Sequence, residues 1–156
     1  MPYPEELIAP MRQDLVQLGF QELKTADQVD EVLGTEQRTT VVAINSVCGC
    51  SAGGMRPGVA VSLGNEIKPD VLVSVFAGQD LEATERAREY FTGYPPSSPA
   101  VALMKNGELV YMLERHEIEG RHPLEIADTL KAAYDEHCSV SPEAPELPAV
   151  CFVGFF

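Results

Sequence analysis

A short apolar run, TVVAI at residues 40–44, constrains the fold more than any other segment of this chain. It is too short for a stable helix and rich in β-branched residues, so the sequence predicts a strand over residues 39–46. The run is continuously apolar, which is typical of a central strand that is covered on both faces. The chain must therefore supply neighbouring strands on both sides of this one and helices above and below the sheet.

The remaining elements are predicted from helical spacing, capping residues and turn signals. Apolar residues at Leu7, Met11, Leu15 and Leu18 predict a first helix, and a capping-box pattern at Thr25 begins a second. Further helices are expected over residues 52–63, over residues 81–91 with Asp80 as the cap, and from Pro123 onward. Further strands are expected over residues 71–77, 100–105 and 108–114, the last two joined by Asn106-Gly107, a strong hairpin signal.

This order predicts an α/β fold with a mixed four-stranded sheet. A parallel βαβ unit with a right-handed connection is followed by an antiparallel hairpin, and helices cover the sheet. Residues 139–156 differ in composition, because Pro142, Pro145 and Pro148 precede an apolar end that contains Cys151. We therefore expect one domain over residues 1–138 and a Pro-rich tail over residues 139–156.

The charge of the chain excludes some classes of partner. It has 11 basic and 24 acidic residues, for a formal net charge of −13. A strongly acidic protein repels polyphosphate and anionic lipid, so we expect neither nucleic acid nor a membrane as a partner. The first residues show no targeting pattern, so we expect a cytoplasmic protein. In that reducing compartment, a close pair of cysteines is typical of catalysis or metal binding.

The pair Cys48-Gly49-Cys50 lies between the central strand and the start of a helix. The unpaired N–H groups and the partial positive charge at a helix start both stabilise a thiolate. Cysteines in such places have lowered pKa values, and the thiolate is the attacking species. We assign Cys48, nearest the strand, as the nucleophile and Cys50 as the thiol that resolves a mixed disulfide on Cys48. Gly49 relaxes the backbone limits on closing the small Cys48–Cys50 ring.

Two other segments are predicted to lie beside the cysteines. Pro99 opens a strand that runs antiparallel to the central one, so its beginning lies near Cys48. A cis-proline there would present the backbone of Ser98 to a disulfide-bonded substrate. Arg115 and His116 end the next strand on the same side and could contact carboxylates of a thiol substrate. A solvated turn is the alternative for that segment.

Several motifs taken together resemble the bacilliredoxin family over residues 7–138. They are Asn45-Ser46-Val47-Cys48-Gly49-Cys50 with Arg56-Pro57, Val75-Phe76-Ala77-Gly78-Gln79-Asp80, Arg88-Glu89-Tyr90-Phe91-Thr92-Gly93, Pro96-Ser97-Ser98-Pro99 and Arg115-His116-Glu117-Ile118-Glu119-Gly120. The tail with Cys151 extends beyond the part that resembles the family. Compared with thioredoxin, the cysteines have a one-residue spacer, and Val42 and Ala43 stand where a buried acid often assists proton transfer.

The resemblance implies a thioredoxin-like fold and a thiol–disulfide oxidoreductase of the bacterial cytoplasm. It implies removal of bacillithiol from S-bacillithiolated client proteins, with bacillithiol as co-substrate and no bound cofactor. On that reading Cys48 takes the bacillithiol, and either free bacillithiol or Cys50 then resolves it. A weak disulfide isomerase activity is also associated with the family.

Other interpretations of the cysteines stay open at this point. Cys48 and Cys50 could serve a general protein disulfide isomerase. They could also form a soft-metal-binding or redox-sensing module, with His116 or the His137-Cys138 pair completing the ligand set. A one-residue spacer is short for zinc, which usually takes four ligands from well-spaced pairs. Cys138 is otherwise a partly buried bystander, and Cys151 is either an exposed thiol or part of a docked tail.

Overall fold

The computed structural model describes residues 3–35 and 38–138, and these residues form one five-stranded sheet. The strands are β1 (Gln21–Glu22), β2 (Thr39–Asn45), β3 (Val71–Phe76), β4 (Ala100–Lys105) and β5 (Glu108–Leu113), in the spatial order β1-β3-β2-β4-β5. The central strand β2 is parallel to β3 and antiparallel to β4, and β4 is antiparallel to β5. The mixed sheet, its parallel unit and its hairpin are therefore as predicted.

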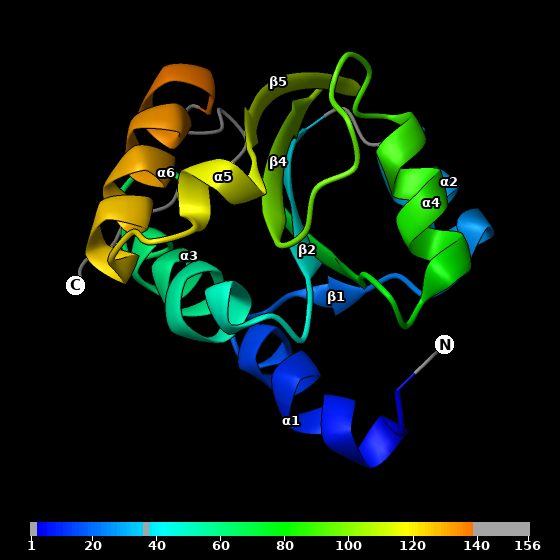
Figure 1. Cartoon of the computed structure of the whole chain (residues 1–156). Helices are drawn as coiled ribbons and strands as arrows, with labels where there is room; N and C mark the ends of the chain where they lie inside the picture. The colour runs from blue at the N-terminus through cyan, green and yellow to red at the C-terminus, as the bar shows by residue number, and fades with distance from the viewer. Residues whose placement is uncertain (1–2, 36–37, 139–156) are drawn as a thin grey trace.

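Helices cover both faces of this sheet (Figure 1). They are α1 (Glu5–Val16), α2 (Ala26–Leu33), α3 (Arg56–Ser62), α4 (Leu81–Glu89), α5 (Arg115–Ile118) and α6 (Pro123–His137), with a π-helical segment η1 (Ser51–Met55) before α3. Helices α3 and α6 lie on one side of the sheet, and α2 and α4 lie on the other. All seven residues of β2 are buried, which confirms the predicted central strand.

Two expectations about elements were wrong. The sheet has five strands rather than four, because the two polar residues of β1 pair in parallel with Val73 and Ser74 at the edge of the sheet. A two-residue strand is too short to show any periodicity. The segment at Arg115, for which a solvated turn was the alternative to a substrate contact, is the short helix α5, which Glu114 and Glu117 cap at its start by a capping box.

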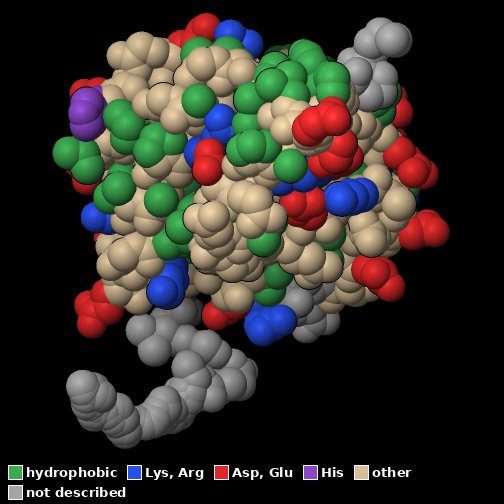
Figure 2. Space-filling model, turned by 90° about the horizontal axis from the view of Figure 1, so that it is seen from below, with side chains coloured by type: hydrophobic (Ala, Val, Ile, Leu, Met, Phe, Trp, Pro, Cys, Tyr) green, Lys and Arg blue, Asp and Glu red, His purple; other side chains and the backbone are tan. Residues whose placement is uncertain are grey.

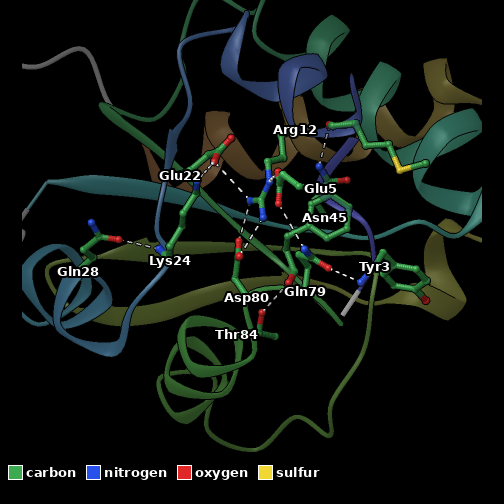
Figure 3. A network of polar contacts seen from close by, with 12 residues as sticks. Tyr3, Glu5, Arg12, Glu22, Lys24, Gln28, Asn45, Gln79, Asp80 and Thr84 are labelled. Carbon is green, nitrogen blue, oxygen red and sulfur yellow. Dashed lines mark hydrogen bonds and ion pairs between the residues drawn. The ribbon is translucent and has the colours of Figure 1, made fainter. Parts of the chain in front are cut away.

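The buried face of α1 differs from the predicted one and carries a charge. Ile8, Arg12 and Leu15 are buried, whereas Leu7 is 50% exposed. Arg12 donates two hydrogen bonds to Asp80, of 2.7 and 2.9 Å, and one of 2.9 Å to Glu5. Figure 3 shows this network, which joins α1 to the loop before α4. Asp80 occupies the N-cap position of α4 as predicted, but its carboxylate faces Arg12 instead of the helix.

The helix after the cysteines is not uniform, in contrast to the predicted α-helix over residues 52–63. It begins with the wider turns of η1 and changes to α-helix at Arg56. Pro57 lacks an N–H group and could not complete a regular ladder of hydrogen bonds in mid-helix. The change of helix type just before Pro57 places this residue in the first turn of α3, where no N–H partner is needed.

Gly58 permits the close packing of α3 on α6. A Cβ atom at this position would lie 2.7 Å from Cγ2 and 2.9 Å from Cβ of Ile126. Because Cβ of Ile126 is next to its backbone, the neighbour cannot swing away, and one of the two helices must shift.

We expect Gly58→Ala to lower the free energy of unfolding by about 1–3 kcal/mol through this overlap, despite the better helix propensity of alanine. Gly53 offers a matched control, because a Cβ atom there meets nothing within 4 Å. Urea denaturation of both variants measures the difference. Equal stability of the Gly58→Ala and Gly53→Ala proteins would contradict the close packing.

The face seen from below Figure 1 carries mixed charges. In Figure 2, basic side chains lie scattered among acidic ones rather than gathered in one stripe. No helix within the described residues is long and apolar enough to span a bilayer. The predicted tail, residues 139–156 with Cys151, lies outside the described residues, so its boundary stays a prediction.

Candidate active site

The dithiol lies where the central strand ends and the helical segment begins. Cys48 and Cys50 lie between the end of β2 at Asn45 and the start of η1 at Ser51, and both are half-buried thiols. They line a cavity of about 390 Å³ together with Ile118 and Arg121. A substrate sulfur can thus approach the pair from solvent, while the helix behind it holds the backbone in place.

The surroundings of the two thiols move their pKa values in opposite directions. The backbone N–H of Cys50 points at Sγ of Cys48, with 3.4 Å between N and S, and this hydrogen bond is the main cause that lowers the pKa of Cys48. Arg115 adds a positive charge, since its Nη2 lies 3.2 Å from the same sulfur. Burial is the first cause that raises the pKa of Cys50. Cys48 is therefore the thiol that ionises first, which supports its assignment as the nucleophile.

Arg115 and Glu119 act on Cys48 with opposite signs, since Arg115 lowers the pKa of Cys48 and Glu119 raises it. We expect Arg115→Gln to raise the pH at which Cys48 ionises and Glu119→Gln to lower it. The pH dependence of iodoacetamide alkylation in a Cys50→Ser background measures both shifts. Shifts of the same sign in the two variants would contradict the charge arrangement.

The loop before β4 lies beside this pair, as the antiparallel pairing predicts. Ile44 of β2 is paired with Ala100 of β4, so Pro99 lies at the end of the sheet from which the chain continues to Cys48. The peptide bond between Ser98 and Pro99 is cis. The Ser98 carbonyl accepts a hydrogen bond of 3.3 Å from Nη1 of Arg115, and the other end of that guanidinium reaches Cys48.

The structure separates the two residues predicted at the end of β5. Arg115 contacts Cys48 directly, whereas His116 is exposed on α5. Both line a second cavity of about 460 Å³, which also includes Ser97, Ser98 and Arg88. Of the two, Arg115 is the residue placed to act on the reacting sulfur.

A buried amide beneath the dithiol was not predicted. Oδ1 of Asn45 accepts hydrogen bonds from the Ser46 N–H at 2.9 Å, the Ser51 hydroxyl at 2.9 Å and Nη1 of Arg56 at 3.2 Å. Nδ2 of Asn45 donates to the Met11 carbonyl at 3.0 Å. Because Ser46 and Ser51 flank the cysteines, one amide group holds both ends of the loop that carries them.

The geometry argues against a metal site in which the His137-Cys138 pair joins Cys48 and Cys50. Cys138 is buried in the core cluster at the end of α6, beside Thr39 at the start of β2. The dithiol follows the other end of that strand, about 20 Å away for seven residues. His137 and Cys138 therefore cannot complete a ligand set with Cys48. His122, at the start of α6, accepts a hydrogen bond from the Leu124 N–H and caps that helix.

Sequence comparisons identify the family of this chain. A family model described as disulphide isomerase matches residues 3–138. A bacilliredoxin of Shouchella clausii is 52% identical over 136 residues, which cover 87% of this chain and 95% of that protein. The chain belongs to the bacilliredoxin family. A bacilliredoxin of Salinibacter ruber is 48% identical over 151 residues, covering 96% of this chain and 89% of that protein.

A comparison with solved structures identifies the fold of this bacilliredoxin family member. The thioredoxin of Malassezia sympodialis superposes with a TM-score of 0.51 at 20% identity, covering 76% of this chain and 90% of that one. The fold is thioredoxin-like, as the family resemblance implied. Family membership and a thioredoxin-like fold make the protein a thiol–disulfide oxidoreductase, and the half-buried dithiol is the candidate site for that chemistry.

Proposed function

We propose that this protein removes bacillithiol from S-bacillithiolated client proteins. The single observation that supports this most is the environment of Cys48, whose thiolate accepts a hydrogen bond from Cys50 N–H and lies 3.2 Å from Arg115. Its relatives carry the name bacilliredoxin, which supports bacillithiol as the thiol concerned. The client proteins and the low-molecular-weight thiol are the partners, and the cytoplasm is the proposed location.

The reaction begins at Cys48. Its thiolate attacks the bacillithiol sulfur of the client's mixed disulfide, and the client cysteine leaves as a thiolate that takes up a proton. Bacillithiol is then disulfide-bonded to Cys48. In the second step Cys50 loses its proton and attacks Sγ of Cys48, which expels bacillithiol as a thiolate and forms a Cys48–Cys50 disulfide. Two molecules of a low-molecular-weight thiol reduce that disulfide and are oxidised to their own disulfide.

The loop of Ser98 and Pro99 positions the substrate in this scheme. The backbone of Ser98 lies beside Cys48, and the Ser98 carbonyl accepts a hydrogen bond from Arg115. An extended client segment can lie along this loop with its disulfide directed at Cys48. Arg115 keeps the sulfur negative until it attacks, and His116 lies at the outer rim of the neighbouring cavity.

A competition between two substrates tests the proposal. One client peptide is prepared as its bacillithiol and as its glutathione mixed disulfide, and release of the peptide thiol is followed for both. We expect the bacillithiol form to react at least about tenfold faster, which corresponds to about 1.4 kcal/mol of transition-state binding. Equal rates would overturn the choice of bacillithiol and leave a general thiol–disulfide oxidoreductase. If the protein rearranges the disulfides of a scrambled protein faster than it releases either peptide thiol, an isomerase would be favoured.

A further inference from the structure

Arg88 is a partly buried cation without a negative partner. Within residues 3–35 and 38–138, no carboxylate forms an ion pair with it, and its buried Nε has no hydrogen-bond acceptor. Its one hydrogen bond is a long contact of 3.5 Å from Nη2 to the Ser97 carbonyl. Burial lowers the pKa of Arg88, and no charged neighbour is among the causes that act on it. A buried donor with no acceptor is costly, and among the described residues the charge of this guanidinium has no ion-pair partner.

Other arginines of the chain show how unusual this is. Arg12 has three carboxylates around it, and Arg86, two residues before Arg88 on α4, pairs with Asp30 and Glu89. Arg56 shares the unsatisfied Nε, but it lies 3.4 Å from Asp14 and donates to Asn45. Within the described part of the chain, Arg88 thus combines a buried donor with an unbalanced charge.

Arg88 lines the cavity that adjoins the active site. This cavity of about 460 Å³ is bounded by Arg88, Ser97, Ser98, Arg115 and the carboxylates of Glu114 and Glu119, among others. Such a volume suits a small molecule. The two carboxylates already have partners, since Glu119 pairs with Arg115 at 3.1 Å and Glu114 closes the capping box of α5. The lining thus holds two arginines and two carboxylates, and of the two arginines only Arg115 is in an ion pair among the described residues.

A chain of contacts joins Arg88 to the reacting sulfur. Its Nη2 meets the carbonyl of Ser97, and the hydroxyl of Ser97 accepts a hydrogen bond of 2.7 Å from the Arg115 N–H. The side chain of Arg115 then spans from the Ser98 carbonyl to Cys48. A small molecule disulfide-bonded to Cys48 can therefore extend past Arg115 along this loop toward Arg88.

We propose that Arg88 binds a carboxylate of the low-molecular-weight thiol while that thiol is exchanged at Cys48. The inference rests on the proposed function and names the group that this site recognises. A guanidinium presents its N–H donors in a planar fork that matches a carboxylate, and a charge-assisted hydrogen bond is about twice as strong as a neutral one. Arg88 contacts the substrate far from the exchanging sulfurs, so it determines which thiol is accepted and leaves the chemistry of Cys48 unchanged.

Two small disulfides that differ in charge test this inference in a Cys50→Ser background. Bis(2-carboxyethyl) disulfide carries carboxylates, and bis(2-hydroxyethyl) disulfide carries hydroxyl groups. With either one, the Cys48 thiolate attacks one sulfur, forms a mixed disulfide and releases one thiolate, which is followed by its absorbance or by intact mass. We expect Arg88→Gln to slow the carboxylate probe about tenfold and the hydroxyl probe less than twofold.

The control variant is Arg86→Gln, which removes the same charge from the same helix but not from the cavity. It should leave the ratio of the two rates unchanged, and Arg88→Lys should restore part of the preference because it keeps the charge without the fork. A thermal melt of each variant establishes that it is folded. If Arg88→Gln slows both probes equally, or slows neither, the inference is overturned. The rates with the two probes do not depend on whether bacillithiol is preferred over glutathione. Failure of this inference and failure of the proposed function are therefore distinguishable.

Discussion

Replacement of Cys48 by serine is expected to reduce exchange with a bacillithiol mixed disulfide by at least about a thousandfold, since a serine hydroxyl is not ionised at neutral pH. The Cys48 thiolate is the group that the Cys50 N–H and Arg115 stabilise, and Cys50, with its raised pKa, cannot replace it. Release of the client thiol, measured at neutral pH with excess substrate, follows the reaction. Retained activity in the Cys48→Ser protein would contradict the assignment of the nucleophile.

The matched variant Cys50→Ser separates the two steps. It keeps the thiolate of Cys48, so the first exchange should proceed, and an adduct of the small thiol on Cys48 should accumulate and be visible by intact mass. Addition of free thiol should then release that adduct by direct attack. If the variant turns over at the normal rate with no adduct, Cys50 does not resolve the mixed disulfide and the protein works with one thiol.

The second large effect concerns stability rather than activity. Arg12→Met is expected to lower the free energy of unfolding by about 3 kcal/mol, because it leaves the mostly buried carboxylate of Asp80 without its partner, whereas Glu22 keeps its ion pair with Lys24. Methionine keeps an apolar stem but removes the guanidinium that lies over the ring of Phe76, so the loss reports the ion pair together with this cation–π contact. Urea denaturation at neutral pH measures it.

Arg86→Gln is the control for this experiment, since its ion pair with Asp30 lies at the surface. The side chains of that pair are 40% and 39% exposed, compared with 8% for Arg12. Exposed ion pairs contribute about 0–1 kcal/mol, so the control should lose no more than that. A loss in Arg86→Gln as large as that in Arg12→Met would show that burial does not determine the value of these pairs.

The parts of the structure that could be predicted are those encoded in local patterns. The run at residues 40–44 predicted the buried strand β2, and Asn106-Gly107 predicted the hairpin, in which both residues have positive φ. The antiparallel direction of the strand that Pro99 opens then predicted that Pro99 lies beside Cys48. These inferences need only the spacing of the apolar residues and the rule that an antiparallel strand begins beside the end of its neighbour.

The parts that were missed depend on contacts between distant segments. The apolar spacing of α1 gave no sign that Arg12 would turn inward, because its partner Asp80 is 68 residues away. The amide of Asn45 had one available signal, a polar residue that ends an apolar strand directly before the cysteines. Arg88 stood in one of the motifs that resemble the family, but the alternating charges of its helix did not distinguish it from Arg86.

The hydrogen bond between the two cysteines also fixes the order of events. Part of the reason that the pKa of Cys50 is raised is the charge of Cys48 and the hydrogen bond between the two thiols. Once Cys48 is disulfide-bonded to the small thiol, that sulfur carries no charge, both effects end, and the pKa of Cys50 falls. On the proposed mechanism, burial still raises the pKa of Cys50, but the resolving thiol becomes easier to ionise after Cys48 has captured its substrate. Two thiols with a single residue between them would otherwise compete for the same incoming disulfide.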